Sequence, residues 1–290
     1  MADPLVIKID LNSETVSKAL ELIAQAGYLL YEPTRIKRRA KAETDSLIIK
    51  TKGEIAIEQL QKQAFYRWAK LETVRQENIN KLTTNALQQV QLSKKQIDPS
   101  TDADWVRKYF GFSQDISNED MQLIWSKVLS GELIKSGSFS YKTMSILANM
   151  RKDDAELFSK LCSYTLIIAG EKKVSLIFGD GSFAAYNQKA FSFEDLQLLE
   201  SLGLIHFNDI TNFKVMSISS KQMPFICGKD SYLLVTQEEK VDINVGSVML
   251  TREGQELFKV ITTETSPNLI EIVKKNWIIN GRSLTKIGES

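Results

Sequence analysis

The sequence holds few of the side chains that enzymes use most often in catalysis. His206 is the only histidine. This excludes a metal site with several histidine ligands and any Cys–His site that needs two histidines. Cys162 and Cys227 are far apart and outside any C-x-x-C spacing, which argues against a structural zinc site or disulfide and indicates a reducing compartment. We therefore predict no metal, no cofactor and no catalytic residue, and the sequence favours a non-enzymatic protein over an enzyme.

Two pairs of neighbouring acids, Glu119–Asp120 and Asp153–Asp154, could supply carboxylate chemistry. Both are expected at helix starts, where acidic side chains are favoured by the helix dipole. A glycine-rich run at 179–182 lacks the Lys-Ser/Thr of a phosphate-binding loop and is typical of a hairpin turn. An enzyme with an unrecognised carboxylate site stays open as an alternative, although no spacing favours it.

The sequence also contains a basic cluster, five cations within seven residues: Arg35, Lys37, Arg38, Arg39 and Lys41. Such a cluster beside an amphipathic helix can bind anionic lipid. It can equally bind nucleic-acid phosphates, form a solvated helix face, or contact acidic residues of a neighbouring subunit. Between residues 34 and 90 cations outnumber acids by six, whereas the whole chain has a net charge of +1. This asymmetry favours contact between the basic helix and a more acidic remainder within an assembly.

A long helix is expected over residues 34–93, because apolar residues recur there in steps of three, four and four, with Arg75 as the one charged exception. These steps sum to eleven, a period that keeps packed helices nearly straight. Residues 34–90 of this helix would span roughly 85 Å, while a compact chain of 290 residues has a radius of gyration of about 19 Å. We therefore predict a homo-oligomer whose interface is Ile57, Leu60, Ala64, Trp68, Leu71, Ile79, Leu82 and Ala86.

The chain of 290 residues fits two domains, or one domain and a long helix. No apolar run approaches the length that crosses a bilayer, and the first residues lack the plan of a signal peptide. We expect a cytoplasmic protein, with membrane association through the basic cluster as an alternative. The expected parts are an N-terminal amphipathic segment (1–33), the long helix as an assembly stalk (34–93), a compact helical domain (102–168) and an α+β domain (169–290).

The expected fold class is α+β, and the last part has a winged-helix-like pattern: a helix, Gly203-Leu204-Ile205, several strands and then Leu250-Thr251 with Gly254. DNA reading by a winged helix needs a basic recognition helix. The helix in that place, at 194–200, is acidic, so the sequence favours packing or protein contact over DNA binding.

The middle of the chain resembles an uncharacterised bacterial domain family related to the abortive-infection alpha proteins. The resemblance covers most of Tyr31 to Leu161, with a weaker match at 250–254. Its residues are mostly aromatic and helix-capping positions, namely Trp105, Tyr109, Phe110, Ser117, Asp120, Trp125, Leu129, Gly131, Gly137, Leu147, Asp154 and Phe158. The resemblance implies a role in phage resistance or in a mobile element, and it implies no catalytic residues. Trp125 and Phe158 are expected in the core, and Ser117 and Asp120 at a helix cap.

Together these features predict a non-enzymatic, self-assembling bacterial protein of the anti-phage, abortive-infection type, acting through oligomerisation of its long helix. One alternative is a protein that binds nucleic acid or an anionic membrane surface through the basic cluster. A phage or host protein is a further candidate partner.

Overall fold

The computed structural model confirms a chain of mixed helix and strand, with a long N-terminal helix and a C-terminal sheet. It divides into two compact units, 1–148 and 149–290, and each is described by itself. The helix at 152–162, expected in the helical domain, thus lies in the second unit. The residues described are 9–10, 13–28, 55–168, 172–175, 190–208, 210–218, 221–237, 241–261, 264–279 and 281–287.

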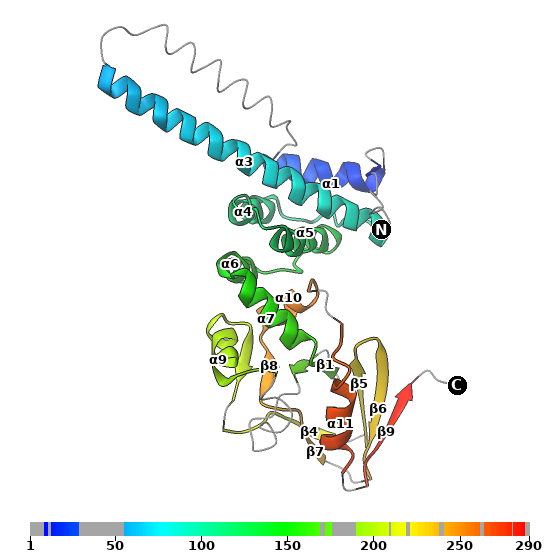
Figure 1. Ribbon diagram of the computed structural model, residues 1–290. Helices are drawn as coiled ribbons and strands as arrows, with labels where there is room; N and C mark the ends of the chain where they lie inside the picture. The colour runs from blue at the N-terminus through cyan, green and yellow to red at the C-terminus, as the bar shows by residue number, and fades with distance from the viewer. Residues whose placement is uncertain are drawn as a thin grey trace, which may run out of the picture. The chain divides into compact units, whose positions relative to one another are not determined.

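The first unit is helical. Its described helices are α1 (Glu14–Gln25), α3 (Ile55–Ser93), α4 (Ala103–Ser113), α5 (Glu119–Ile134) and α6 (Tyr141–Asn149). Figure 1 shows α1, α4 and α5 along the C-terminal half of α3, whose N-terminal end extends beyond them. This arrangement leaves the two halves of α3 in different environments.

Aromatic side chains form the centre of this unit. Trp125, Tyr109 and Phe110 are fully buried, as expected for Trp125. The Tyr109 and Trp125 rings meet edge to face with centroids 5.4 Å apart, and the Tyr109 hydroxyl donates to the Trp125 carbonyl over 2.9 Å. Tyr28, just beyond α1, stacks on Phe110 at 4.4 Å. The aromatic residues at helical spacing therefore form a packed core.

The capping residue of α5 differs from the one expected. Asn118, not Ser117, is the N-cap, and its side chain accepts from the Met121 amide over 3.1 Å. The Ser117 hydroxyl instead accepts from the Asn78 amide on α3 over 3.2 Å. Serine and asparagine are both favoured caps, so local preference could not separate two adjacent candidates, and the contact with α3 decided between them.

The second unit contains an antiparallel sheet and four described helices: α7 (Lys152–Cys162), α9 (Phe193–Ser201), α10 (Arg252–Phe258) and α11 (Leu269–Trp277). The sheet has the order β3-β8-β2-β1-β5-β6-β9, and β4 (Lys214–Ile218) pairs separately with β7 (Val241–Asn244). The bounds of the seven strands are β1 Thr165–Ile168, β2 Lys172–Ser175, β3 Ile205–Phe207, β5 Gln222–Cys227, β6 Asp230–Val235, β8 Val248–Leu250 and β9 Ser283–Ile287.

The core of the second unit lies on one face of this sheet, beneath α11. Phe225 on β5 and Leu166 on β1 are buried there, and Phe225 meets the Trp277 ring edge to face at 5.1 Å. The Trp277 indole donates to the Asn244 carbonyl over 2.7 Å, which ties α11 to β7. Strand alternation places Ile167 and Ile226 on the opposite face.

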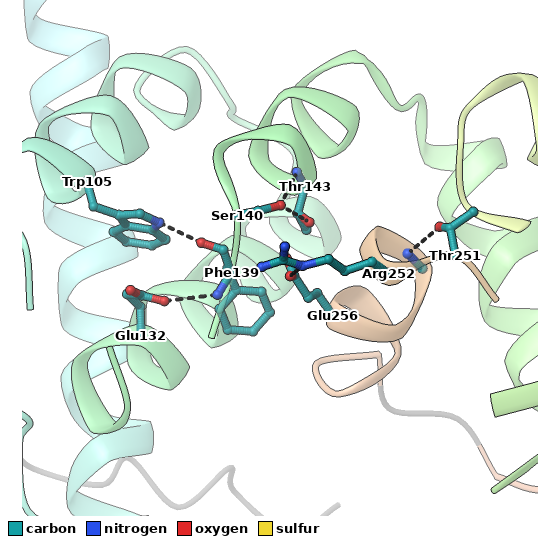
Figure 2. Close-up of polar contacts among 9 residues, drawn as sticks. Trp105, Glu132, Phe139, Ser140, Thr143, Thr251, Arg252 and Glu256 are labelled. Atoms are coloured by element: carbon teal, nitrogen blue, oxygen red, sulfur yellow. Dashed lines mark hydrogen bonds and ion pairs between the residues drawn. The ribbon is translucent and has the colours of Figure 1, made fainter. Parts of the chain in front are cut away.

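The elements of the expected winged helix are present, but a winged helix is not established. Ser192 and Asp195 form a capping box at the start of α9, and Thr251 caps α10 by accepting from the Gly254 amide over 3.0 Å (Figure 2). A side chain at Gly254 would collide with the Leu204 carbonyl, which explains the glycine. Strand β8 pairs with both β3 and β2, so these strands belong to the seven-stranded sheet.

Candidate functional site

The N-terminal half of α3 exposes large apolar side chains. The exposed fractions are 67% for Leu60, 55% for Trp68, 51% for Leu71 and 40% for Val74. With 39 residues, α3 is about 58 Å long. Contiguous exposed apolar surface of this kind marks interaction sites in soluble proteins.

These side chains share one side of the helix. At 100° per residue, positions 60, 64, 68, 71 and 74 fall within about a third of the helix circumference. We call Leu60, Ala64, Trp68, Leu71 and Val74 the exposed stripe. Tyr66, which is 58% exposed, lies on another side. Val74 was not among the predicted interface residues, although its spacing of three from Leu71 is the helical signal that could have included it.

The C-terminal part of the predicted interface is not available to another copy. Ile79 is 4% exposed, and Leu82 and Ala86 are fully buried. Their surroundings belong to the same unit, in which α3 packs most extensively on α5. This corrects the predicted interface, because the same apolar spacing serves internal packing here. Ile57 belongs to α3, but its side chain is outside the described part.

Polar contacts fix α3 at the point where the stripe ends. Asn78 donates to the Gln114 carbonyl over 2.9 Å, and Gln122 on α5 donates to Asn78 over 3.0 Å. Arg75, the charged exception in the predicted stripe, bonds Asp115 in the loop between α4 and α5, and this hydrogen bond raises the pKa of Arg75. The second half of α3 is thus held by hydrogen bonds as well as apolar packing.

The basic cluster of Arg35, Lys37, Arg38, Arg39 and Lys41 lies outside the described residues. The structure therefore gives no geometry for the predicted anion or lipid contact. Within the described residues, no helix has the length and apolar run needed to span a bilayer.

The residues with catalytic side chains are dispersed. His206 is exposed on β3 and pairs across the sheet with Met249. Cys162 and Cys227 are buried, and burial raises the pKa of both thiols, which disfavours the nucleophilic thiolate. The acid pairs lie in the first turns of α5 and α7, as expected. In the described part of the chain, no group of three or more His, Cys, Asp or Glu could hold a metal ion.

Comparison with protein families gives a match over most of the chain. The family described as "Protein of unknown function (DUF2806)" matches residues 62–274, which is well over half of the chain and includes parts of both units. No curated protein and no solved structure matches this chain. The matched region begins within the exposed half of α3 and continues through the aromatic core and most of the sheet. The chain belongs to the DUF2806 family, whose function is unknown.

Proposed function

We propose that this protein is a non-enzymatic assembly protein whose copies associate through the exposed stripe of α3. The observation that carries the proposal is the change along this one helix. Downstream of Arg75, Ile79, Leu82 and Ala86 are buried within the unit. Upstream, Leu60, Trp68 and Leu71 are more than half exposed. A second copy supplies the cover that the described part of the unit does not.

The apolar gain from pairing two stripes is of the same order as the cost of association. Complete burial of a leucine or valine side chain stabilises by about 1.5–3 kcal/mol. A two-fold symmetric contact uses the same patch on both partners, so each buried position counts twice. Only the part that is still exposed can be buried, so Leu60, Leu71 and Val74 from two chains, with the larger Trp68, give a gain in the lower part of the roughly 4–15 kcal/mol range for the cost of association.

The test is the mass of the full chain in solution, measured by light scattering coupled to size exclusion. We expect the parent protein to be an oligomer and the double variant Leu60→Asp/Leu71→Asp to be a monomer with an unchanged melting temperature. Leu123→Asp is the matched control, because Leu123 is 48% exposed but lies on α5. A monomeric parent protein would overturn the proposal, as would equal dissociation by the control.

We further propose that assembly serves anti-phage defence of the abortive-infection type. Support comes from the resemblance of the aromatic and capping positions between Trp105 and Phe158 to that group of bacterial families. Expression of the parent protein in a phage-sensitive host should reduce plaque formation, and Leu60→Asp/Leu71→Asp should lose this protection. Undiminished protection by a monomeric variant would separate defence from assembly and contradict the proposed mechanism.

A further inference from the structure

The second unit contains a pocket of about 740 Å³. This volume falls in the range of small-molecule sites. Its walls come from the C-terminal end of α7, strands β1, β5 and β6, the end of α10 and the start of α11. These segments are far apart in the sequence and are brought together by the strand order β1-β5-β6.

Apolar side chains form much of the pocket. Ile167 and Ile226 are direct neighbours across β1 and β5, on the sheet face opposite the core. Ile226 is 39% exposed although it lies within a strand near the middle of the sheet. Phe258, Ile261 and Ile270 are partly buried and complete this apolar lining. An apolar group of a ligand would cover surface that the unit leaves open.

The walls of the pocket are held in place by contacts within the unit. The Ser266 amide donates to the Ser163 carbonyl over 2.9 Å, which joins the segment before α11 to the end of α7. Gly228 has a φ of +64°, and a Cβ there would lie 2.5 Å from the Thr265 hydroxyl, so glycine permits this close approach. The pocket is therefore largely formed before any ligand arrives.

Among the described residues that line the pocket, Lys229 is a cation without an ion-pair partner. Asp230 forms an ion pair with Lys286 at 3.4 Å, and Glu264 already has an interaction of its own. Among the described residues, the exposed Lys229 ammonium has no hydrogen-bond or ion-pair partner. The start of α11, a helix whose N-cap Asn268 makes no side-chain capping bond, adds the positive end of a helix dipole.

The two thiols in the pocket do not add negative charge near neutral pH. Burial raises the pKa of Cys227 to about 11 and raises that of Cys162 as well. Both side chains are therefore neutral, polarisable wall groups under ordinary conditions.

We infer that this pocket binds a small organic anion with an apolar body, such as a medium-chain carboxylate. The apolar chain lies against Ile167, Ile226 and Phe258, and the carboxylate lies beside Lys229. This inference is independent of the exposed stripe, which belongs to the first unit.

Calorimetric titration of the full chain with decanoate and with decyltrimethylammonium tests the inference, because the two probes have equal apolar length and opposite charge. We expect one decanoate per chain and an affinity for the cation at least five-fold lower. Leu60→Asp/Leu71→Asp should bind decanoate like the parent protein, which excludes adhesion to the stripe. No decanoate binding, or equal affinity for the two probes, would overturn the inference.

Two variants locate the site. Lys229→Glu should weaken decanoate binding about five-fold, as expected for one partly solvated ion pair, whereas Lys214→Glu on β4 should not change it. Ile226→Thr keeps the β-branched shape suited to a strand and should weaken binding by reducing the apolar contact. Unchanged affinity in both Lys229→Glu and Ile226→Thr would place any bound decanoate elsewhere and overturn the assignment.

Discussion

Arg75 and Asp115 form a double hydrogen bond, with Nε 2.7 Å from Oδ1 and a terminal guanidinium nitrogen 3.1 Å from Oδ2. This pair joins α3 to the loop between α4 and α5, and it lies at the boundary between the two environments of α3. One turn upstream Leu71 is half exposed, and one turn downstream Ile79 is buried. The pair therefore marks where α3 leaves its own unit's core.

Loss of this pair should have a small effect on stability. Both side chains keep contact with water, at 35% exposure for Arg75 and 58% for Asp115. Exposed pairs contribute up to about 1 kcal/mol, so Arg75→Met should lower the free energy of unfolding by that amount or less. A double-mutant cycle with Asp115→Asn, measured by urea unfolding, isolates the pair. A coupling energy well above this range would mean that the pair contributes more than a surface contact.

Leu82→Asp should unfold the first unit, in contrast to Leu60→Asp. Leu82 is fully buried on the half of α3 that packs inside the unit, so the variant places an unpaired carboxylate in an apolar core. A buried uncompensated charge costs about 3–5 kcal/mol. Circular dichroism melting should show a large drop for Leu82→Asp and almost none for Leu60→Asp. Equal stability of the two variants would contradict the assigned burial.

These two leucines also show how far the sequence could predict the site. Leu60 and Leu82 are separated by two complete eleven-residue periods, and the pattern gives both the same role. Periodicity reports which side of a helix is apolar, but not whether that side meets the same chain or another one. The difference depends on α5, which packs along only part of α3. The existence of the stripe was thus predictable, whereas the division at Arg75 was not.

The sequence predicts a helix N-cap correctly where only one favoured capping residue lies near the helix start. Ser192 with Asp195 and Thr251 with Gly254 have the sequence spacing typical of helix starts, and the structure places helix starts there. The pocket of the second unit gave no local signal, because Ile167 and Ile226 become neighbours only through the pairing of β1 with β5. Pairing between strands this distant in sequence follows from the whole sheet and not from a motif.

Glu132→Gln should destabilise the first unit by about 2–4 kcal/mol. The buried Glu132 carboxylate accepts from the Gly137 amide over 2.6 Å and from the Phe139 amide over 3.0 Å. Figure 2 shows the contact with the Phe139 amide. Hydrogen bonds to a charged group contribute about 1.5–3 kcal/mol each, and glutamine offers one acceptor and one donor in place of two acceptors. Urea unfolding measures the loss. Exposed Glu119→Gln on the same helix is the control and should cost much less.

The stability of the protein should fall as the pH rises from about 9 to 11. Burial raises the pKa of the Cys227 thiol from its ordinary value of 9.0 to about 11. The folded state then holds the thiol proton more tightly than the unfolded state, so this contribution is complete below pH 9 and is lost through pH 11. Urea unfolding under reducing conditions at several pH values measures it. Cys227→Ala should show a shallower decline, and an unchanged slope would contradict the raised pKa.

Trp125→Ala should strongly destabilise the first unit. The Trp125 side chain is fully buried and meets the Tyr109 ring, whose hydroxyl bonds the Trp125 carbonyl. Truncation of a buried tryptophan costs about 3–5 kcal/mol, because apolar burial is lost and a cavity remains. Thermal unfolding should therefore show a large decrease.

Trp68→Ala is the matched control for this variant, since Trp68 is 55% exposed on the stripe. It should melt like the parent protein yet shift the equilibrium toward monomer in light scattering. The two tryptophans thus separate packing from assembly within one unit. A Trp125→Ala protein that melts normally but no longer protects against phage would contradict the core assignment, because the Trp125 side chain would then have to act in contact with a partner.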